Sequence, residues 1–362
     1  MLRTVVELAS AGRFEELAEL FAPELRAAVS ADIMRIAWAK EVGAVRHVGE
    51  PIPLGDNRFS VLLNGTVELR MSMDDQGRVN GLRLAPPAAQ WQPPSYVRPE
   101  RFTEREVLVG PQPGALVLPH NGTGAGIVLL SGAGAFDRDE TAGPMKMLKD
   151  LAWGLGSLGV ASVRFDKPTD APTLVEEYVP AAVAGVELLR QHADRVHVAG
   201  HSAGGKIAPK VAQWAPSVAG LVLLAADTSP MPAAAVSVAR HFGLEVDTMT
   251  RLAARASSPD LTPATPASDL PFGLPATYWL QLRDYDQVTT AIEVDRPMLV
   301  LQGGRDYQVT VDDDLPGWRR VPRAEARIYP DLDHMFFRDN GSHVDRQVIE
   351  DIADWVSSPV GG

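Results

Sequence analysis

Residues 195–205 read Arg195-Val-His-Val-Ala-Gly-His-Ser-Ala-Gly-Gly205, and this segment is the strongest indication of the fold class. Residues 196–199 are expected to form a short, mainly apolar strand, and the segment from Ala203 to Trp214 has helical periodicity. Between them, residues 200–204 match the pattern Gly-x-Ser-x-Gly. A serine at such a strand–turn–helix junction lies at the positive end of the following helix. The junction predicts Ser202 as a nucleophile, whereas the alternative is a glycine-rich turn whose serine only caps the helix.

Composition and turn geometry both support a serine nucleophile. The chain of 362 residues contains no cysteine, which excludes thiol nucleophiles, disulfide bonds and thiolate metal sites. The sharp turn brings the backbone so close to its neighbours that side chains at Gly200 and Gly204 would collide with them. We therefore expect Ser202 to carry the chemistry, without a metal.

A serine hydroxyl becomes nucleophilic only when a base takes its proton, and an acid must hold that base in the right tautomer. On this architecture the acid and then the base follow the serine along the chain. His334 follows the last expected strand and is the expected base, with His343 as the alternative. Asp306, just past the penultimate strand, is the expected acid, and Asp227, at the end of the strand before it, competes for that role.

A tetrahedral intermediate also needs two backbone N–H donors for its oxyanion. One is expected from Ala203, the residue after the nucleophile. The other is expected from the small-residue loop 131–136, Ser-Gly-Ala-Gly-Ala-Phe, which follows an apolar strand. Ala133 is the first choice for this donor and Gly134 the second. A nucleotide-binding loop is not favoured, because no Gly-Lys-Ser/Thr follows.

From residue 101 onward, short apolar strands alternate with helical stretches. This pattern predicts a mainly parallel sheet covered by helices on both faces. The expected strands are 106–109, 115–118, 126–130, 161–165, 196–199, 221–224, 297–302 and 326–329, and the expected helices are 145–158, 172–191, 203–214 and 343–356. Residues 228–294 are too long for a plain connection and are interpreted as a helical insertion that forms a cap.

The first 85 residues have a different pattern. Helical periodicity over residues 5–39 gives way to strand alternation at 59–63, 67–71 and 79–84, with a hairpin turn at Asp74-Asp75-Gln76-Gly77. Residues 1–85 are therefore expected to form a small α+β domain, and residues 86–100, which contain five prolines, a stiff linker. Residues 101–362 are expected to form the second domain, with the mainly parallel sheet and the cap insertion described above.

Charge and hydropathy narrow the range of partners. The formal net charge is 34 − 46 = −12, which disfavours nucleic acid and anionic membranes. No apolar run approaches the ~20 residues needed to span a bilayer. The first residues lack the uninterrupted apolar stretch and cleavage site of a secretory signal, so a cytoplasmic location is expected.

Several motifs together resemble a known family, the bacterial α/β-hydrolase serine esterases with a Gly-Ser-Gly-Pro-x-Asp-Arg-Asp signature. The motifs are residues 137–141, the 146–155 helix, 164–167, the 200–204 turn, Tyr278-Trp279 with Tyr285-Asp286, and 302–309. Residues 1–85 resemble the DUF3887 domain that often precedes these enzymes, which implies a cystatin-like or NTF2-like shape. The resemblance covers almost the whole chain.

The resemblance implies an α/β-hydrolase fold and a serine carboxylesterase without cofactor. It assigns Ser202 as nucleophile, Asp306 as acid and His334 as base. Two runs depart from the family pattern. Its His-Gly-Ser-Gly-Pro run reads Ser-Gly-Ala-Gly-Ala at 131–135, and its Asp-Lys-Arg run reads Asp-Lys-Pro at 166–168. Because the oxyanion donor is a backbone group, the substitutions affect the expected substrate preference more than catalysis.

The expected substrate is a small to medium organic ester or thioester, or another acyl compound. Its expected contacts are Gly134, Phe136, His201, Tyr278 and Trp279, mostly small or aromatic residues of the oxyanion loop and the cap. An acyltransferase or cyclising thioesterase-like enzyme is the second hypothesis, and a binding or dimerisation protein without catalysis is the third. The front domain is expected to cover the site, bind a partner, or pair with a second copy as a homodimer through an exposed strand edge.

Overall fold

The computed structural model describes residues 1–55, 57–87, 91–168, 170–241, 243, 245–339 and 341–358. The chain divides into two compact units, Met1–Gln90 (unit 1) and Trp91–Gly362 (unit 2), which are described separately.

Unit 1 is a small α+β unit, as the sequence predicts. Its helices are α1 (Leu2–Ser10), α2 (Phe14–Glu19), α3 (Pro23–Ala28) and α4 (Ala31–Glu41). Its antiparallel sheet has the order β1 (Ile52–Pro53), β2 (Arg58–Leu63), β3 (Val67–Met73), β4 (Val79–Ala85). Alternate strand residues such as Val61, Leu69 and Val79 are buried in one apolar cluster with residues of the helices. The period-2 pattern in the sequence therefore reflects a sheet with one covered face.

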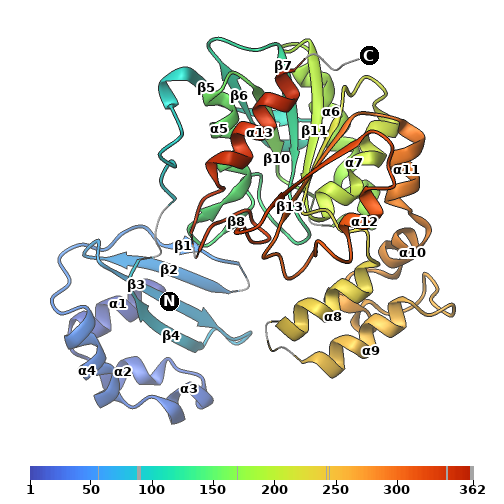
Figure 1. The fold of residues 1–362 in the computed structure, drawn as a ribbon. Helices are drawn as coiled ribbons and strands as arrows, with labels where there is room; N and C mark the ends of the chain where they lie inside the picture. Colours follow the sequence, from blue (N-terminus) through green and yellow to red (C-terminus); the bar gives the residue numbers. More distant parts are fainter. Residues whose placement is uncertain are drawn as a thin grey trace. The chain divides into compact units, whose positions relative to one another are not determined.

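Among the described residues, unit 2 builds an eight-stranded sheet in the order β14-β13-β12-β11-β7-β10-β6-β5 (Figure 1). All neighbouring pairs from β14 to β10 are parallel, whereas β6 is antiparallel to both β10 and β5. The strands are β5 (Phe102–Val109), β6 (Gln112–Pro119), β7 (Ala125–Leu130), β10 (Ala161–Phe165), β11 (Arg195–His201), β12 (Leu221–Leu224), β13 (Met298–Gly303) and β14 (Ala324–Tyr329). The predicted mainly parallel sheet is confirmed.

Helices cover both faces of this sheet, and the side chains of β7 show why. Ile127 and Leu129 are buried in the cluster that includes α5 and α13, whereas Val128 and Leu130 are buried in the cluster that includes α6 and α7. A strand buried on both sides has no polar face, and its sequence is therefore continuously apolar. The covering helices are α5 (Met147–Ser157), α6 (Leu174–Leu189), α7 (Ala203–Trp214), α11 (Gln287–Val294) and α13 (Arg346–Ser357).

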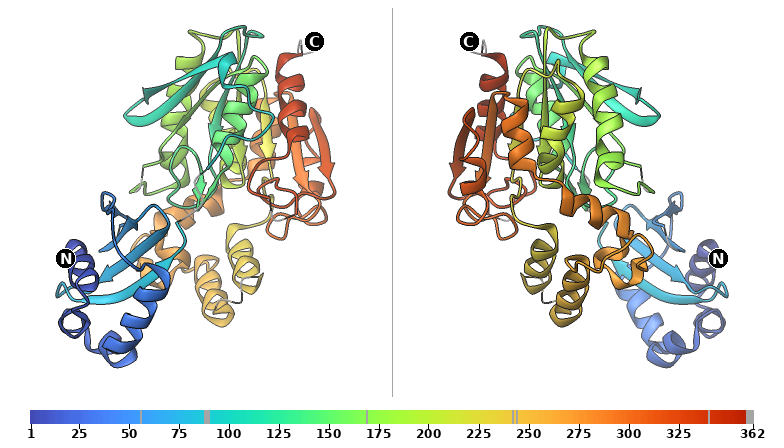
Figure 2. Two further views of the ribbon diagram at one scale, coloured as in Figure 1. Left: turned by 90° about the vertical axis from the view of Figure 1, so that its left-hand side faces the viewer. Right: turned by 90° about the vertical axis from the view of Figure 1, so that its right-hand side faces the viewer.

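The segment between β12 and β13 is helical, as expected for an insertion. It contains α8 (Met231–His241) and α9 (Val246–Ala256), which lie side by side below the sheet in Figure 2, and α10 (Ala276–Asp284). Short 3-10 turns at Ala267–Asp269 and Pro271–Gly273 precede α10. The last helix, α11, packs against α7 and so belongs to the layer on the sheet. The insertion outside that layer is therefore shorter than the expected 228–294.

Part of the expected linker 86–100 packs on unit 2, and its residues 88–90 lie outside the described residues. The indole Nε1 of Trp91 donates to Asp150 Oδ1 on α5 (2.7 Å), and the Tyr96 hydroxyl donates to the Val344 carbonyl (2.9 Å). The short elements that complete the unit are the 3-10 turn Pro99–Arg101, β8 (Thr141–Ala142), β9 (Met145–Lys146) and α12 (Leu315–Trp318). Within the described ranges, no helix is both long and apolar enough to cross a bilayer.

Candidate active site

Ser202 sits at a strained turn between β11 and α7. Its backbone has φ 50° and ψ −116°, a conformation that a residue with a side chain rarely adopts and that costs on the order of 1–3 kcal/mol. The two glycines around it are required by space. A Cβ at Gly200 would lie 2.2 Å from the backbone of Gly204, and one at Gly204 would lie 2.6 Å from the carbonyl oxygen of Leu130. The Ser202 N–H donates to the Leu224 carbonyl (2.8 Å), which fixes the turn to β12.

His334 and Asp306 come from the loops after the last two strands, β14 and β13. His334 Nδ1 lies 2.7 Å from Asp306 Oδ2, and both side chains are buried. The other carboxylate oxygen of Asp306 accepts the N–H groups of Gln308 (2.8 Å) and Val309 (2.9 Å). With Nδ1 donating to this carboxylate, Nε2 of His334 is left as an acceptor for a proton.

The alternative acid and base have other partners. Asp227 forms an ion pair with Lys206 Nζ (2.8 Å), and His343 Nδ1 lies 3.1 Å from Asp150. Of the candidates considered from the sequence, the structure therefore pairs Asp306 with His334.

The loop after β7 approaches the nucleophile closely. A Cβ at Gly132 would lie 3.5 Å from the Cβ of Ser202. The next residue, Ala133, lines the same cavity as Ser202 and Ala203. The N–H groups of Ala133 and Ala203 donate no hydrogen bond to the rest of the described chain. Both are therefore available to a ligand.

A buried lysine and a tyrosine hold this loop by one carbonyl group. Gly132 O accepts Lys167 Nζ (2.6 Å) and the Tyr178 hydroxyl (2.9 Å). Lys167 Nζ also donates to the Tyr178 oxygen (2.8 Å) and pairs with Glu177 (2.8 Å), so its three protons all have acceptors. Burial lowers the pKa of Lys167, and the charge of Glu177 opposes that shift. These groups fix the loop, and Lys167 and Glu177 also line the cavity at Ser202.

A second buried pair joins the loop to the histidine loop. Glu140 Oε1 accepts the Gly132 N–H (2.9 Å) and lies 2.7 Å from His201 Nδ1. His201 Nε2 lies 3.0 Å from the carbonyl oxygen of His334. Burial opposes charge on both groups, but their mutual attraction outweighs it. This attraction lowers the pKa of Glu140 and, together with the His334 carbonyl, raises the pKa of His201.

Ser202 opens into a cavity of about 520 Å³. Near the serine its wall is polar, with the Lys206–Asp227 and Lys167–Glu177 ion pairs. Farther out the insertion provides an apolar wall: Met231, Ala234, Ala235 and Val238 of α8, Phe272, Leu274, and Leu282 of α10. The cavity can hold a small to medium organic molecule with an apolar part.

Of the five residues expected to contact substrate, only some line the Ser202 cavity. Gly134 and Tyr278 line the Ser202 cavity, and the Tyr278 hydroxyl donates to Glu177 Oε2 (2.7 Å). Phe136 is half-buried and does not line the cavity. Trp279 does not line this cavity and is buried in an apolar cluster with residues of α9 and α10. His201 does not line the cavity either and is buried between Glu140 and His334.

Sequence reasoning missed Glu140, Lys167, Tyr178 and Lys206. A signal for the charged residues was present, since a lone charge next to an apolar buried strand is rarely left without a function or a partner. Lys167 follows β10 by two residues, and Lys206 lies one helical turn after Ser202. Their partners, however, are far away in the sequence and could not be deduced.

The charged run 137–139 holds the loop after β7 to its surroundings. Asp139 pairs with Arg164 (2.9 Å) and Lys146 (2.8 Å), and Arg138 pairs with Asp166 (3.1 Å). The carboxylates and the guanidinium of this run are therefore engaged in ion pairs within the protein. Over the described ranges, no cluster of His, Asp and Glu side chains suited to a metal ion is found.

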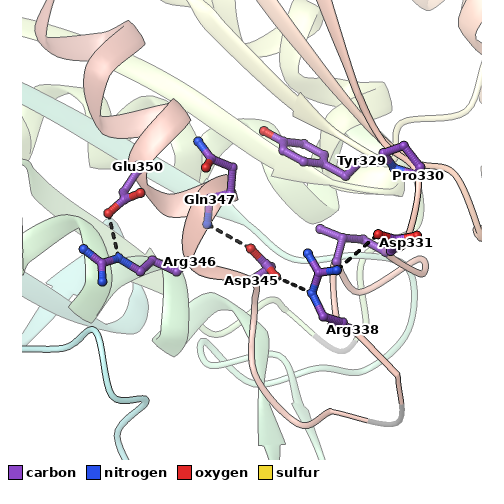
Figure 3. A pocket seen from close by; sticks show the side chains of 9 residues that line it. Tyr329, Pro330, Asp331, Arg338, Asp345, Arg346, Gln347 and Glu350 are labelled. Carbon is purple, nitrogen blue, oxygen red and sulfur yellow. Dashed lines mark hydrogen bonds and ion pairs between the residues drawn. The ribbon is translucent and has the colours of Figure 1, made fainter.

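A separate cavity of about 340 Å³ lies between the end of β14 and the start of α13 (Figure 3). Its charged groups pair with one another: Arg338 with Asp331 (3.2 Å) and Asp345 (3.1 Å), and Arg346 with Glu350 (2.7 Å). None of the groups that line it belongs to the Ser202 site.

A strained serine between a strand and a helix, with an Asp–His pair after the last two strands of a mainly parallel sheet, defines the class of α/β hydrolases. A profile described as the alpha/beta hydrolase family matches residues 127–345. The esterase EstD of Thermotoga maritima is 30% identical over 328 residues, 81% of this chain and 77% of EstD. The chain belongs to the alpha/beta hydrolase family.

A solved structure of similar fold supports this assignment. A hormone-sensitive lipase from a metagenome library superposes with a TM-score of 0.50 at 20% identity, over 72% of this chain and 87% of the lipase. Est1E from Butyrivibrio proteoclasticus is similar with a TM-score of 0.47 at 16% identity, over 70% of this chain and 96% of Est1E.

Proposed function

We propose that this protein is a serine hydrolase that cleaves carboxylic esters, including thioesters, through an acyl-enzyme on Ser202. His334 acts as the base, Asp306 orients it, and the N–H groups of Ala133 and Ala203 bind the oxyanion. The observation that carries the proposal is the 2.7 Å contact between His334 Nδ1 and Asp306 Oδ2, which leaves the other ring nitrogen to accept a proton.

The reaction follows from these roles. Ser202 Oγ attacks the ester carbonyl while its proton passes to His334 Nε2, and the carbonyl oxygen becomes the oxyanion. The tetrahedral intermediate expels the alcohol or thiol, which takes the proton from His334. Water then attacks the acyl-enzyme with His334 as base, and the carboxylic acid leaves.

Two further observations support ester chemistry. The relative EstD is described as an esterase. The cavity at Ser202 has about 520 Å³ and an apolar outer wall, which suits the acyl chain or alcohol of a small to medium ester.

The test is Ser202→Ala, measured on p-nitrophenyl butyrate and with a fluorophosphonate probe. We expect turnover to fall by on the order of 10⁴- to 10⁶-fold and labelling to disappear. Ser268→Ala, at an exposed residue of the insertion, is the control and should keep both. A loss of less than tenfold in Ser202→Ala would show that another group is the nucleophile, and a wild type that neither labels nor turns over would refute the hydrolase.

A further inference from the structure

His201 is the last residue of β11, directly before the proposed nucleophile, and only 2% of it is exposed. Each of its ring nitrogens faces an oxygen. Nδ1 lies 2.7 Å from Glu140 Oε1, and Nε2 lies 3.0 Å from the carbonyl oxygen of His334. His201 is not among the residues that line the Ser202 cavity, so it has no route to a substrate.

The two oxygens decide the protonation of the ring. A backbone carbonyl can only accept a hydrogen bond, and so can an ionised carboxylate. A neutral imidazole carries one N–H and could satisfy only one of them, whereas an imidazolium carries two. Burial opposes the ionised form of Glu140, but the attraction of the His201 ring, the Gly132 N–H that its Oε1 accepts and the Lys167 ammonium together lower its pKa.

We propose that His201 is an imidazolium at neutral pH and that its ion pair with Glu140 positions the catalytic base. This inference rests on the proposed function of His334. Nε2–H holds the backbone carbonyl of His334, and Nδ1–H holds a carboxylate oxygen that also binds the oxyanion loop at Gly132. The hydrogen bonds Gly132–Glu140–His201–His334 thus connect the loop that binds the oxyanion to the loop that carries the base. His201 is a positioning residue and takes no part in proton transfer.

The charged and titratable groups around the ring come from four loops. Glu140 follows β7, Lys167 follows β10, Asp306 follows β13, and the His334 ring lies 4.7 Å from the His201 ring between centroids. Burial opposes the charge, but Glu140, the His334 carbonyl and Asp306 together raise the pKa of His201. The ring therefore loses its proton only on the alkaline side of its usual range, and the bond to the His334 carbonyl weakens there.

His197 provides a matched comparison on the same strand. It is fully buried, packs edge-on against Trp355, and burial lowers its pKa to about 4. Two histidines four residues apart on β11 should therefore differ in charge at pH 7.5, with His201 positive and His197 neutral. The difference arises from the partners of each ring, because both rings are buried.

The first experiment is ¹⁵N NMR of the full-length protein labelled at histidine, at pH 7.5. We expect both ring nitrogens of His201 to carry a proton and His197 to carry one. His197→Phe and His334→Gln each remove one of the three buried histidine signals, so the remaining one is assigned without changing His201. A His201 ring with a single protonated nitrogen would overturn the proposal. This readout needs no ester turnover, so it separates failure of the proposal from failure of the proposed function.

The second experiment measures kcat and KM of Glu140→Gln, His201→Gln and the double variant. A displacement of the base by about 1 Å can lower turnover by ~10²-fold. We expect kcat to fall by ~10- to 10³-fold with KM within threefold, and the double variant to lose no more than the worse single one. His197→Phe should keep kcat within twofold.

The pH profile tests the same pair in the wild type. We expect kcat to decline on the alkaline side with an ionisation that His201→Gln lacks. Variants that change KM and kcat equally, or that keep the wild-type profile, would contradict a positioning role. If the His201 variants do not fold, the NMR and the wild-type pH profile still decide the question.

Discussion

The strained backbone conformation of Ser202 contributes to the site in addition to the serine side chain. With φ at 50°, the hydroxyl leaves the turn above the start of α7, and the N–H of Ala203 is left unpaired beside it. The strain is kept because Gly200 and Gly204 allow a close backbone approach, with no room for a Cβ at either position. The glycines could be predicted from the sequence because the turn demands them.

At the same scale, His197 should make the stability of the protein depend on pH. Its pKa is lowered by burial to about 4, so between about pH 6.5 and 4 the unfolded chain binds the proton and the folded chain does not. Its contribution is complete above about pH 6.5 and is lost as the pH falls towards 4, by about 2 to 3 kcal/mol. Urea unfolding at pH 7.5 and at pH 4.5 measures how far the free energy of unfolding falls in acid. In His197→Phe this fall should be smaller by about this amount. An unchanged difference between the two pH values would refute the assignment.

At the scale of elements, α6 fixes the oxyanion loop through Tyr178, whose hydroxyl donates to Gly132 O. A hydrogen bond of this kind contributes about 1 kcal/mol, so Tyr178→Phe should lower kcat by about 5-fold with little change in KM. Steady-state kinetics on p-nitrophenyl butyrate measure both.

Tyr285→Phe is the matched control, because the Tyr285 hydroxyl donates in the same way (2.8 Å) to Lys206 O on α7. It should lose comparable stability in thermal unfolding and keep kcat within twofold. An equal fall of kcat in both variants would mean that the effect reflects general loosening of the fold.

Most helices and strands could be predicted from the sequence. Strands buried on both faces have continuous apolar runs, and the helices between them have helical periodicity. The expected strands 161–165 and 221–224 match β10 and β12 to the residue. The packing of α11 on α7 could not be predicted from the sequence, because it is a tertiary contact. The contact between Asp306 and His334 was expected from chain order. The pairing of Glu140 with His201, 61 residues apart, could not be deduced from local pattern.

At the scale of the whole molecule, every group of the proposed site lies in unit 2. We therefore expect a chain of residues 91–362 to fold and to hydrolyse p-nitrophenyl butyrate with kcat/KM within fivefold of the full chain. The boundary follows from Trp91, whose bond to Asp150 on α5 makes it part of unit 2.

A chain that begins at residue 99 lacks the Trp91 and Tyr96 contacts and should unfold at a lower temperature than the 91–362 chain. If the 91–362 chain folds, judged by circular dichroism, but has lost activity, unit 1 contributes to the site directly. Mass measurement of both chains and of the full protein shows whether residues 1–90 also hold two copies together.

The carbonyl oxygen of Gly132 and the N–H of Ala133 belong to one planar trans peptide group, so they point in opposite directions. The Lys167 ammonium and the Tyr178 hydroxyl both donate hydrogen bonds to the oxygen of that group. They draw electron density towards the carbonyl and make the opposite N–H a stronger donor. The buried ammonium of Lys167 thereby polarises the amide that faces the substrate, and its field reaches the reacting oxygen through a single peptide group.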